Sequence, residues 1–340
     1  MVASLYGAAE EQKTIWVILE QSQGELVGVS FELLAKGREL ADQAGWRLEA
    51  LLMGSRVTGL AKQAFAHGAD KVWLAEHDGL DPFAVEPHAQ VAFQAVMQGK
   101  PSILLTGATP NGRDLAGRLA VRLRAGLNAD CTDLRLEAKR GVLIAEVTGF
   151  GGGVLALLEA PKHRPQMATV RPGVFSRSEA RQEAAGEIVE LPVELRPELG
   201  RTRIVERVVG EGVDLVQTPV LVCGGRGMDG DFAILEQLAA LLEGEVGATR
   251  PPVDEGHIER ERQIGQTGVV CRPQVAIACG ISGAFHFVVG IQNADLVLAI
   301  NSDPEAEIFD FADYCVVGDA FQVLPALIEA IRTEPEVSHA

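Results

Sequence analysis

The stretch Gly265-Gln266-Thr267-Gly268 is followed by Ser282-Gly283-Ala284 and then by Ala299-Ile300-Asn301. The later two segments follow or end short apolar runs, Val275 to Ala278 and Leu296 to Ile300, which are typical of parallel strands buried on both faces. Small and polar residues at the carboxyl ends of such strands let backbone N–H groups approach a phosphate, and a following helix N-terminus adds to the attraction. Three such segments in succession predict a doubly wound parallel sheet that binds a nucleotide.

Composition limits the class of protein. A chain of 340 residues is too long for one comfortable core, and at roughly 150 residues per domain it predicts two. The formal net charge of −17 argues against nucleic acid as a partner, because phosphates repel an acidic surface. The same repulsion disfavours an anionic membrane surface.

The cysteines and the start of the chain indicate a reducing compartment. The five cysteines are Cys131, Cys223, Cys271, Cys279 and Cys315. No two of them form a CxxC pair and no histidines join them at zinc spacing, so neither a metal site nor an iron–sulfur cluster is expected. An odd count predicts reduced thiols. Residues 1–13 lack the basic and apolar regions of a signal peptide, and we therefore expect a cytoplasmic protein.

The first half of the chain alternates strand and helix patterns. Strands are predicted over residues 14–20, 47–54, 71–75 and 102–107, and helices over 31–44, 59–67, 85–98 and 111–124. This alternation predicts a mostly parallel βα sheet covered by helices. Between residues 129 and 170 the pattern changes to short strands, which we interpret as a β addition at the sheet edge.

The domain bounds follow from composition and from proline. Residues 176–188 carry no long apolar run, and Pro192 and Pro197 discourage a continuous helix, so the passage between domains is placed there. In the second domain a strand is predicted at 220–222 and helices at 232–242 and 321–331. The expected division is a flexible N-terminus at 1–13, an α/β domain at 14–190, a linker at 191–203, a nucleotide-binding domain at 204–332 and a tail at 333–340.

With these motifs the chain resembles the alpha subunit of electron transfer flavoprotein. That family carries GGRG, GQTG, a GISGAIQH-like loop and AIN-x-DPEAPIF, which stand here at residues 224–227, 265–268, 280–287 and 299–306. The first half matches through residues 107–109, 112–115, 129–132 and 164–173. The resemblance covers roughly residues 14 to 332.

The resemblance implies FAD as cofactor and a prokaryotic electron carrier without catalytic residues. It implies an electron transfer flavoprotein beta subunit as partner, with residues 113–114 and 129–132 packing against it. Electrons would come from a flavin-dependent dehydrogenase of the acyl-CoA type, or from NADH through the beta subunit, and go to a quinone reductase or ferredoxin. Residues 164–173 are similar to those of anaerobic, often electron-bifurcating members, so a bifurcating system stays open.

The resemblance also assigns the FAD-binding residues. They are Arg226, Thr249, Arg250, Ile264, Gly265, Gln266, Thr267, Ser282, Gly283, Ala284, Phe285, His286, Phe287, Asn301, Asp319 and Ala320. Arg250 is expected over the flavin, where a fixed cation raises the reduction potential. The Thr267 hydroxyl is expected to donate to the ring, and Gln266 to extend into the ligand space beside it. Asp319 is either an adenine contact, the N-cap of the last helix, or both.

One departure from the family pattern bears on the redox properties. The family's loop ends in Gln-His, whereas this chain has His286 and Phe287, and phenylalanine cannot donate a hydrogen bond to the flavin. His286 either reaches the ring instead or serves only the helix terminus.

Two other classes of protein compete with this interpretation. A nicotinamide dehydrogenase lacks support, because no GxGxxG with a downstream acidic residue at the right spacing is present. A subunit that has lost its flavin and only scaffolds a partner stays as the alternative.

Overall fold

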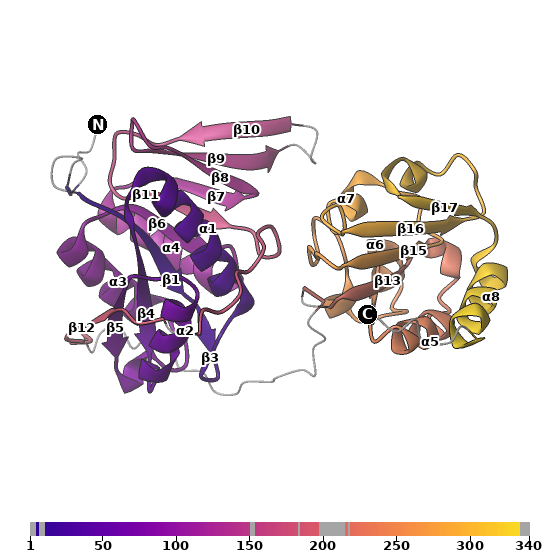
Figure 1. Ribbon diagram of the computed structural model, residues 1–340, viewed down its shortest axis with the longest axis horizontal. Helices are drawn as coiled ribbons and strands as arrows, with labels where there is room; N and C mark the ends of the chain where they lie inside the picture. Colours follow the sequence, from indigo (N-terminus) through magenta and orange to yellow (C-terminus); the bar gives the residue numbers. More distant parts are fainter. Residues whose placement is uncertain are drawn as a thin grey trace. The chain divides into compact units, whose positions relative to one another are not determined.

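The computed structural model describes residues 5–6, 11–149, 154–182, 184–196, 215–216 and 218–333. The chain divides into two compact units, residues 1–207 and 208–340, each built around a parallel sheet (Figure 1). The predicted N-terminus (1–13), the second half of the predicted linker (191–203) and the predicted tail (333–340) fall mainly outside the described residues. The predicted domain bounds stay a prediction.

The first unit contains a seven-stranded sheet in the order β12-β5-β4-β1-β6-β11-β7, in which every pairing is parallel. Its strands are β1 (Gln12–Leu19), β4 (Arg47–Gly54), β5 (Lys71–Glu76), β6 (Pro101–Gly107), β7 (Leu127–Cys131), β11 (Gln166–Val170) and β12 (Glu187–Glu190). The central strands are buried on both faces because their sequences are continuous apolar runs.

Helices cover both faces of this sheet. They are α1 (Gly28–Ala44), α2 (Ala61–Ala66), α3 (Val85–Gly99) and α4 (Pro110–Leu123), with the short 3₁₀ helices η1 (Thr58–Leu60) and η2 (Asp78–Leu80). One core lies under α1 and α2 and a second under α3 and α4. Thr109 begins α4 as its N-cap: its hydroxyl accepts a 2.9 Å hydrogen bond from the Gly112 backbone N–H, and Pro110 occupies the first turn.

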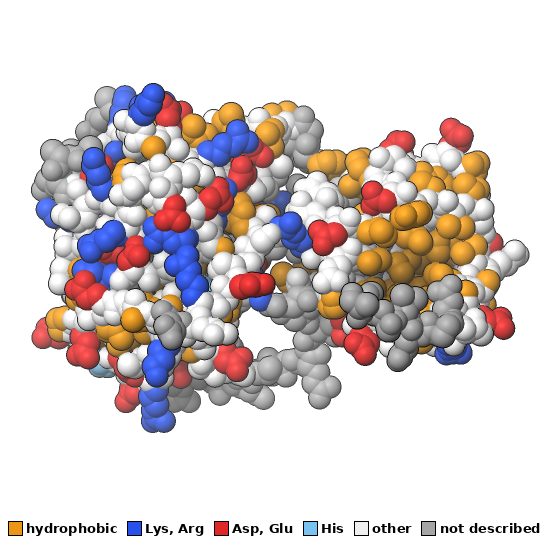
Figure 2. Space-filling model, in the orientation of Figure 1, with side chains coloured by type: hydrophobic (Ala, Val, Ile, Leu, Met, Phe, Trp, Pro, Cys, Tyr) orange, Lys and Arg blue, Asp and Glu red, His pale blue; other side chains and the backbone are white. Residues whose placement is uncertain are grey.

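The predicted β addition is confirmed as an antiparallel sheet of three strands, although the two ends of the predicted stretch 129–170 belong to β7 and β11 of the parallel sheet. The three strands are β8 (Asp133–Glu137), β9 (Val142–Gly149) and β10 (Val154–Glu159), in the order β10-β9-β8. A two-stranded hairpin, β2 (Gln21–Ser22) with β3 (Glu25–Leu26), follows β1. Strand β10 lies at the edge and exposes Val154, Leu155, Leu157 and Leu158, and hydrophobic side chains gather along it in Figure 2.

Residues 187–190 correct one expectation. Residues 187–188 end the stretch 176–188 in which part of the passage between domains was expected, but together with residues 189–190 they form β12, which pairs in parallel with β5. Only Ile188 and Val189 are apolar in this strand, which is too short a pattern to recognise in the sequence. Beyond it, Leu191, Val193 and Leu195 pack against the core of the first unit, so the described part of the predicted linker is attached to that unit.

The second unit confirms the predicted doubly wound parallel sheet. The strands β13 (Val220–Gly224), β14 (Glu245–Ala248), β15 (Val275–Cys279), β16 (Leu296–Asn301) and β17 (Tyr314–Val317) lie in the order β14-β13-β15-β16-β17, all parallel. The connecting helices are α5 (Ala233–Leu241), α6 (Arg250–Asp254), α7 (Phe285–Val288), α8 (Ala320–Thr333) and the 3₁₀ turns η5 (Arg226–Met228), η6 (Arg260–Arg262) and η7 (Glu307–Phe311). A core lies on each face of this sheet.

Within the described ranges, no helix is long and apolar enough to cross a membrane.

Candidate functional site

A cleft of about 1010 Å³ opens at the carboxyl edge of the second unit's sheet. Strand β14 lies on one side of β13 and strands β15 to β17 on the other, so the chain order reverses between β13 and β15. Open α/β sheets bind ligands at such a switch point, and this cleft is at the upper end of the size of small-molecule sites. Its walls are formed by Gly225, Arg226, Gly227, Asp229, Thr249, Arg250, Pro251, Ile264, Thr267, Gly280, Ile281, Ser282, Ala284, His286, Phe287, Asn301, Asp303, Glu305, Ala306 and Glu307.

The floor of the cleft is a contact between two glycine loops. The Gly225 backbone N–H donates to the carbonyl of Cys279 at 2.9 Å, and that of Gly227 donates to the carbonyl of Gly280 at 3.0 Å. A Cβ atom on Gly225 would lie 2.2 Å from the Gly280 carbonyl oxygen, so any side chain there would push the loops apart. Bare backbone at the ends of two parallel strands fits the close approach of a pyrophosphate.

The GQTG turn is clamped between β14 and α7. The Ile264 backbone N–H donates to the Ala248 carbonyl at 2.8 Å, and the Gln266 N–H donates to the His286 carbonyl at 2.8 Å. Gly265 has a φ of 124°, and a Cβ there would lie 2.2 Å from the His286 carbonyl oxygen, so only glycine fits. This geometry turns Thr267 to the cleft, whereas Gln266 is not among the lining residues.

Side chains of both charges line the cleft. Arg226 and Arg250 follow β13 and β14, and their side chains are 75% and 67% exposed, which leaves both guanidinium groups accessible to a ligand. Arg250 Nε lies 2.9 Å from Asp254 Oδ2, a pair on the surface of α6. The segment after β16 adds the acidic residues Asp303, Glu305 and Glu307 to the lining. A dianionic group is attracted to the arginines, and ligand hydroxyls can donate to the carboxylates.

The loop after β15 has the predicted small residues but only a short helix. Helix α7 is a single turn, and the Ile308 backbone N–H donates to the Ser282 carbonyl at 3.0 Å, which ties this loop to η7. The Asn301 side chain braces the same region: its Nδ2 donates to the Ile281 carbonyl at 2.8 Å, and its Oδ1 accepts from the Asp303 backbone N–H at 3.0 Å.

His286 and Phe287, which stand where the family's loop ends in Gln-His, differ in exposure. His286 is exposed and lines the cleft. Phe287 also contributes to the lining but is only 4% exposed, and most of its ring packs in the core beneath the cleft. His286 is therefore the residue of this pair that can donate a hydrogen bond to a ligand.

Asp319 is seated as the N-cap of α8. Its Oδ1 accepts a hydrogen bond of 3.0 Å from the Phe321 backbone N–H, which is the N-cap alternative of the sequence analysis. Neither Asp319 nor Ala320 is among the residues that line the cleft.

The structure thus brings most of the predicted site residues together. Those lining the cleft are Arg226, Thr249, Arg250, Ile264, Thr267, Ser282, Ala284, His286, Phe287 and Asn301, whereas Gly265, Gln266, Gly283, Phe285, Asp319 and Ala320 are outside the lining. Lining residues that the sequence analysis did not assign to the ligand include Asp229, Pro251, Asp303, Glu305 and Glu307. The signal for the last three was their position directly after the end of β16, since loops at that edge line the site.

Three buried thiols lie near the strand ends of this sheet. Burial raises the pKa of the Cys279 thiol to about 12 and raises the pKa of Cys223 well above its ordinary value, with the neighbouring Cys271 and Cys279 adding to the latter shift. The Cys223 and Cys279 thiols therefore stay protonated and unreactive at neutral pH. All five cysteines are free, and no cluster of three metal-ligating side chains occurs among the residues that the structure describes.

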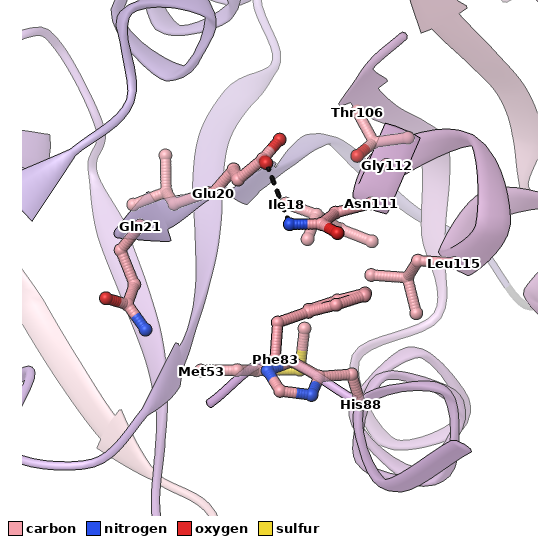
Figure 3. Close-up of a pocket in the computed structure, with 11 residues that line it drawn as sticks. Ile18, Glu20, Gln21, Met53, Phe83, His88, Thr106, Asn111, Gly112 and Leu115 are labelled. Atoms are coloured by element: carbon pink, nitrogen blue, oxygen red, sulfur yellow. Dashed lines mark hydrogen bonds between the residues drawn. The ribbon is translucent and has the colours of Figure 1, made fainter. Parts of the chain in front are cut away.

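The first unit has a switch point of its own at β1, because β4 lies on one side of that strand and β6 lies on the other. The pocket there measures only about 30 Å³, roughly the share of liquid volume that one water takes. Figure 3 shows the Glu20 carboxylate and Asn111 turned toward each other, with Phe83 and His88 packed beside them. The Thr109 hydroxyl donates to Glu20 Oε2 at 2.6 Å, and Asn111 Nδ2 to Oε1 at 3.4 Å. The protein's own carboxylate thus occupies the N-terminus of α4.

Burial shifts the pKa values of the two titratable groups of this pocket, Glu20 and His88, in opposite directions. Desolvation raises the pKa of Glu20, and the hydrogen bonds from Thr109 and Asn111 offset only part of that effect. Desolvation lowers the pKa of His88, whose Nδ1 lies 2.9 Å from the Ala84 carbonyl oxygen.

The fold and the large cleft define a nucleotide-binding protein of the doubly wound α/β class. Residues 15–195 match the model of the electron transfer flavoprotein domain, and residues 214–292 match that of the electron transfer flavoprotein FAD-binding domain. The chain therefore belongs to the electron transfer flavoprotein alpha subunit family, and its cofactor is FAD.

Curated relatives agree over nearly the whole chain. The chain is 43% identical to protein FixB of Clostridium saccharobutylicum, an alignment covering 94% of this chain and 96% of the relative. It is 40% identical to the electron transfer flavoprotein subunit alpha of Thermoanaerobacterium thermosaccharolyticum, and that alignment covers 95% of this chain and 98% of the relative. It is 37% identical to the acryloyl-CoA reductase electron transfer subunit beta of Anaerotignum propionicum, and that alignment covers 94% of this chain and 96% of the relative. The last two of these relatives are named as electron transfer subunits, and this chain is an electron carrier of the same family.

Proposed function

We propose that the cleft of the second unit holds FAD with the pyrophosphate on the glycine loops and Arg226, and the flavin beside Arg250 and Thr267. The observation that carries this proposal is the position of the cleft: it lies at the switch point, has bare backbone at the ends of β13 and β15, and has two accessible arginines on one wall. FAD supplies the redox chemistry, taking up electrons and releasing them again. The protein's residues bind it, orient it and set its potential.

The chain would act as the FAD-carrying half of a heterodimer in the cytoplasm. We infer that it receives electrons from a flavin-dependent dehydrogenase of the acyl-CoA type, or from NADH through the beta subunit, and passes them to a quinone reductase or ferredoxin. The similarity to an electron transfer subunit of an acryloyl-CoA reductase supports an acyl-CoA-linked donor.

A charged cluster on the first unit supports the placement of the beta subunit. Asp130 Oδ1 lies 3.4 Å from Arg113 Nη2, and Asp130 Oδ2 lies 2.7 Å from Arg171 Nη2. The Arg113 side chain is 59% exposed, so the cluster presents a cation at the surface. Two of its members lie in the segments that the resemblance assigns to the contact with the beta subunit, and we infer that the partner covers it.

The purified heterodimer tests the proposal by its visible absorption spectrum. A yellow protein that releases FAD on denaturation supports it. A colourless heterodimer that takes up no added FAD would instead support the alternative of a flavin-free scaffold. Reduction by NADH, followed with and without ferredoxin, then separates a simple carrier from a bifurcating one.

A further inference from the structure

Gln263 lies directly behind the Thr267 hydroxyl and has no part in the lining of the cleft. Its side chain is almost fully buried, at 5% exposed. Its Nε2 donates a 2.9 Å hydrogen bond to Thr267 Oγ1, while Thr267 itself faces the cleft. A buried amide bonded to a cleft residue is an arrangement that can orient that residue.

The backbone fixes Gln263 from both sides. Its carbonyl accepts a hydrogen bond of 2.7 Å from the Val269 N–H, and its N–H donates to the Arg260 carbonyl at 3.1 Å. The same residue pairs with Ala248 at the end of β14. A Cβ atom on Gly268 would lie 2.1 Å from the Gln263 carbonyl oxygen, so the turn closes tightly over it. The amide therefore meets Thr267 from a defined direction.

A hydroxyl group has one proton and two lone pairs. Once Thr267 Oγ1 accepts from the Gln263 amide, its own proton must point elsewhere, and the open side of Thr267 is the cleft. We propose that Gln263 is a positioning residue: it holds the Thr267 hydroxyl as a hydrogen-bond donor toward an acceptor atom of the flavin ring. This inference rests on the proposed placement of the flavin beside Thr267.

The test compares single and double variants of the full heterodimer by FAD affinity and by the visible absorption spectrum of the bound flavin. Gln263→Met keeps the length of the side chain and removes the amide, and Thr267→Val keeps the shape and removes the hydroxyl. Each should weaken FAD binding about threefold to tenfold, the size expected for one net hydrogen bond. Both should shift the flavin absorption bands in the same direction.

The double variant separates positioning from a merely structural role. If Gln263 acts through Thr267, adding Gln263→Met to Thr267→Val changes the affinity less than about twofold, because residues in one hydrogen-bond chain are not additive. Gln263→Glu puts an acceptor in place of the donor, turns the Thr267 proton away from the cleft, and should reproduce the spectral shift of Thr267→Val.

Gln166→Met is a matched control. Gln166 is also a buried glutamine, 1% exposed, but its amide bonds to Leu143 N and Gly141 O in the first unit. The control should lower thermal stability and leave both FAD affinity and spectrum unchanged.

Two results overturn the inference in distinguishable ways. If Thr267→Val weakens FAD binding but Gln263→Met does not, or if the two effects multiply, Gln263 does not position Thr267 and the flavin placement stands. If wild type binds FAD and Thr267→Val changes neither affinity nor spectrum, the flavin is not beside Thr267, and the proposed placement fails together with this inference.

Discussion

The second unit has Gly225 and Gly280 at the ends of the two strands that flank its switch point, whereas the first unit has Glu20, Phe83 and His88 around its own. Both sheets are parallel and both reverse their order there. The second opens into a cleft of about 1010 Å³, and the first leaves about 30 Å³. The topology offers a place for a ligand in each, and the size and charge of the residues at the strand ends decide which one is used.

The largest effect is expected from adding a side chain at the switch point of the second unit, where the cleft opens. Gly225→Ala would put a methyl group against the Gly280 carbonyl, and we expect the purified heterodimer to retain less than about a tenth of the wild-type FAD, because the loops must separate. FAD content by absorbance after denaturation measures this. Gly117→Ala in α4 is the control: no heavy atom lies within 4 Å of the new Cβ, and about 0.5–1 kcal/mol of stabilisation is expected with full FAD content. Full FAD in Gly225→Ala would show that the glycine contact does not hold the site.

Most of the fold and of the candidate site could be predicted from the sequence, and the features that could not be predicted have physical causes. The strand predicted over residues 47–54 is β4 with the same bounds, because a run of apolar residues ending in Gly54 marks a buried strand. Ser282 was predicted in the site from the small residues that follow a strand, and Thr267 was predicted there from the family resemblance. Strand β12 was missed because it depends on pairing with β5. The bond from Gln263 to Thr267 was missed because a single sequence does not show which buried amide faces which hydroxyl.

Arg250→Ala should lower the midpoint potential of the bound FAD. Losing a cation that favours the reduced, more negative ring costs about 1.5–3 kcal/mol if it makes a charge-assisted hydrogen bond, or about 65–130 mV on the scale of 59 mV per tenfold for one electron. A reductive titration measures the shift. Arg272→Ala, outside the cleft lining, is the control. An unchanged potential in Arg250→Ala would place this arginine away from the flavin.

A smaller shift is expected from His286→Ala. His286 is exposed in the cleft, while Phe287 is 4% exposed and packs in the core. Removing a hydrogen-bond donor should lower the potential by about 20–65 mV. Phe287→His should mainly destabilise the second unit, because it buries a polar ring. The same titration decides: if Phe287→His raises the potential while His286→Ala has no effect, His286 has not taken over the family histidine's role.

The smallest effect is expected at the switch point of the first unit, where Glu20 lines the small pocket. Because burial raises the folded-state pKa of Glu20, the stability that its protonated form contributes is present below the unfolded pKa and is lost as the pH rises through the folded pKa. Glu20→Gln should therefore raise the unfolding temperature of the first unit above neutral pH and match wild type under acidic conditions. Tryptophan fluorescence reports on that unit alone, since Trp16, Trp46 and Trp73 are the chain's three tryptophans. The exposed Glu25→Gln is the control, and the same pH dependence in Glu20→Gln as in wild type would contradict the assignment.

The most direct test of the account is an experimental structure of the FAD-loaded heterodimer. We predict flavin density in this chain at the carboxyl ends of β13 and β15, against Gly225, Thr267 and Ser282, with the Glu20 carboxylate still bound by Thr109 in the first unit. FAD bound by this chain at the ends of β1 and β6, with Glu20 displaced, or a cleft in the second unit that stays empty when the protein is yellow, would contradict it.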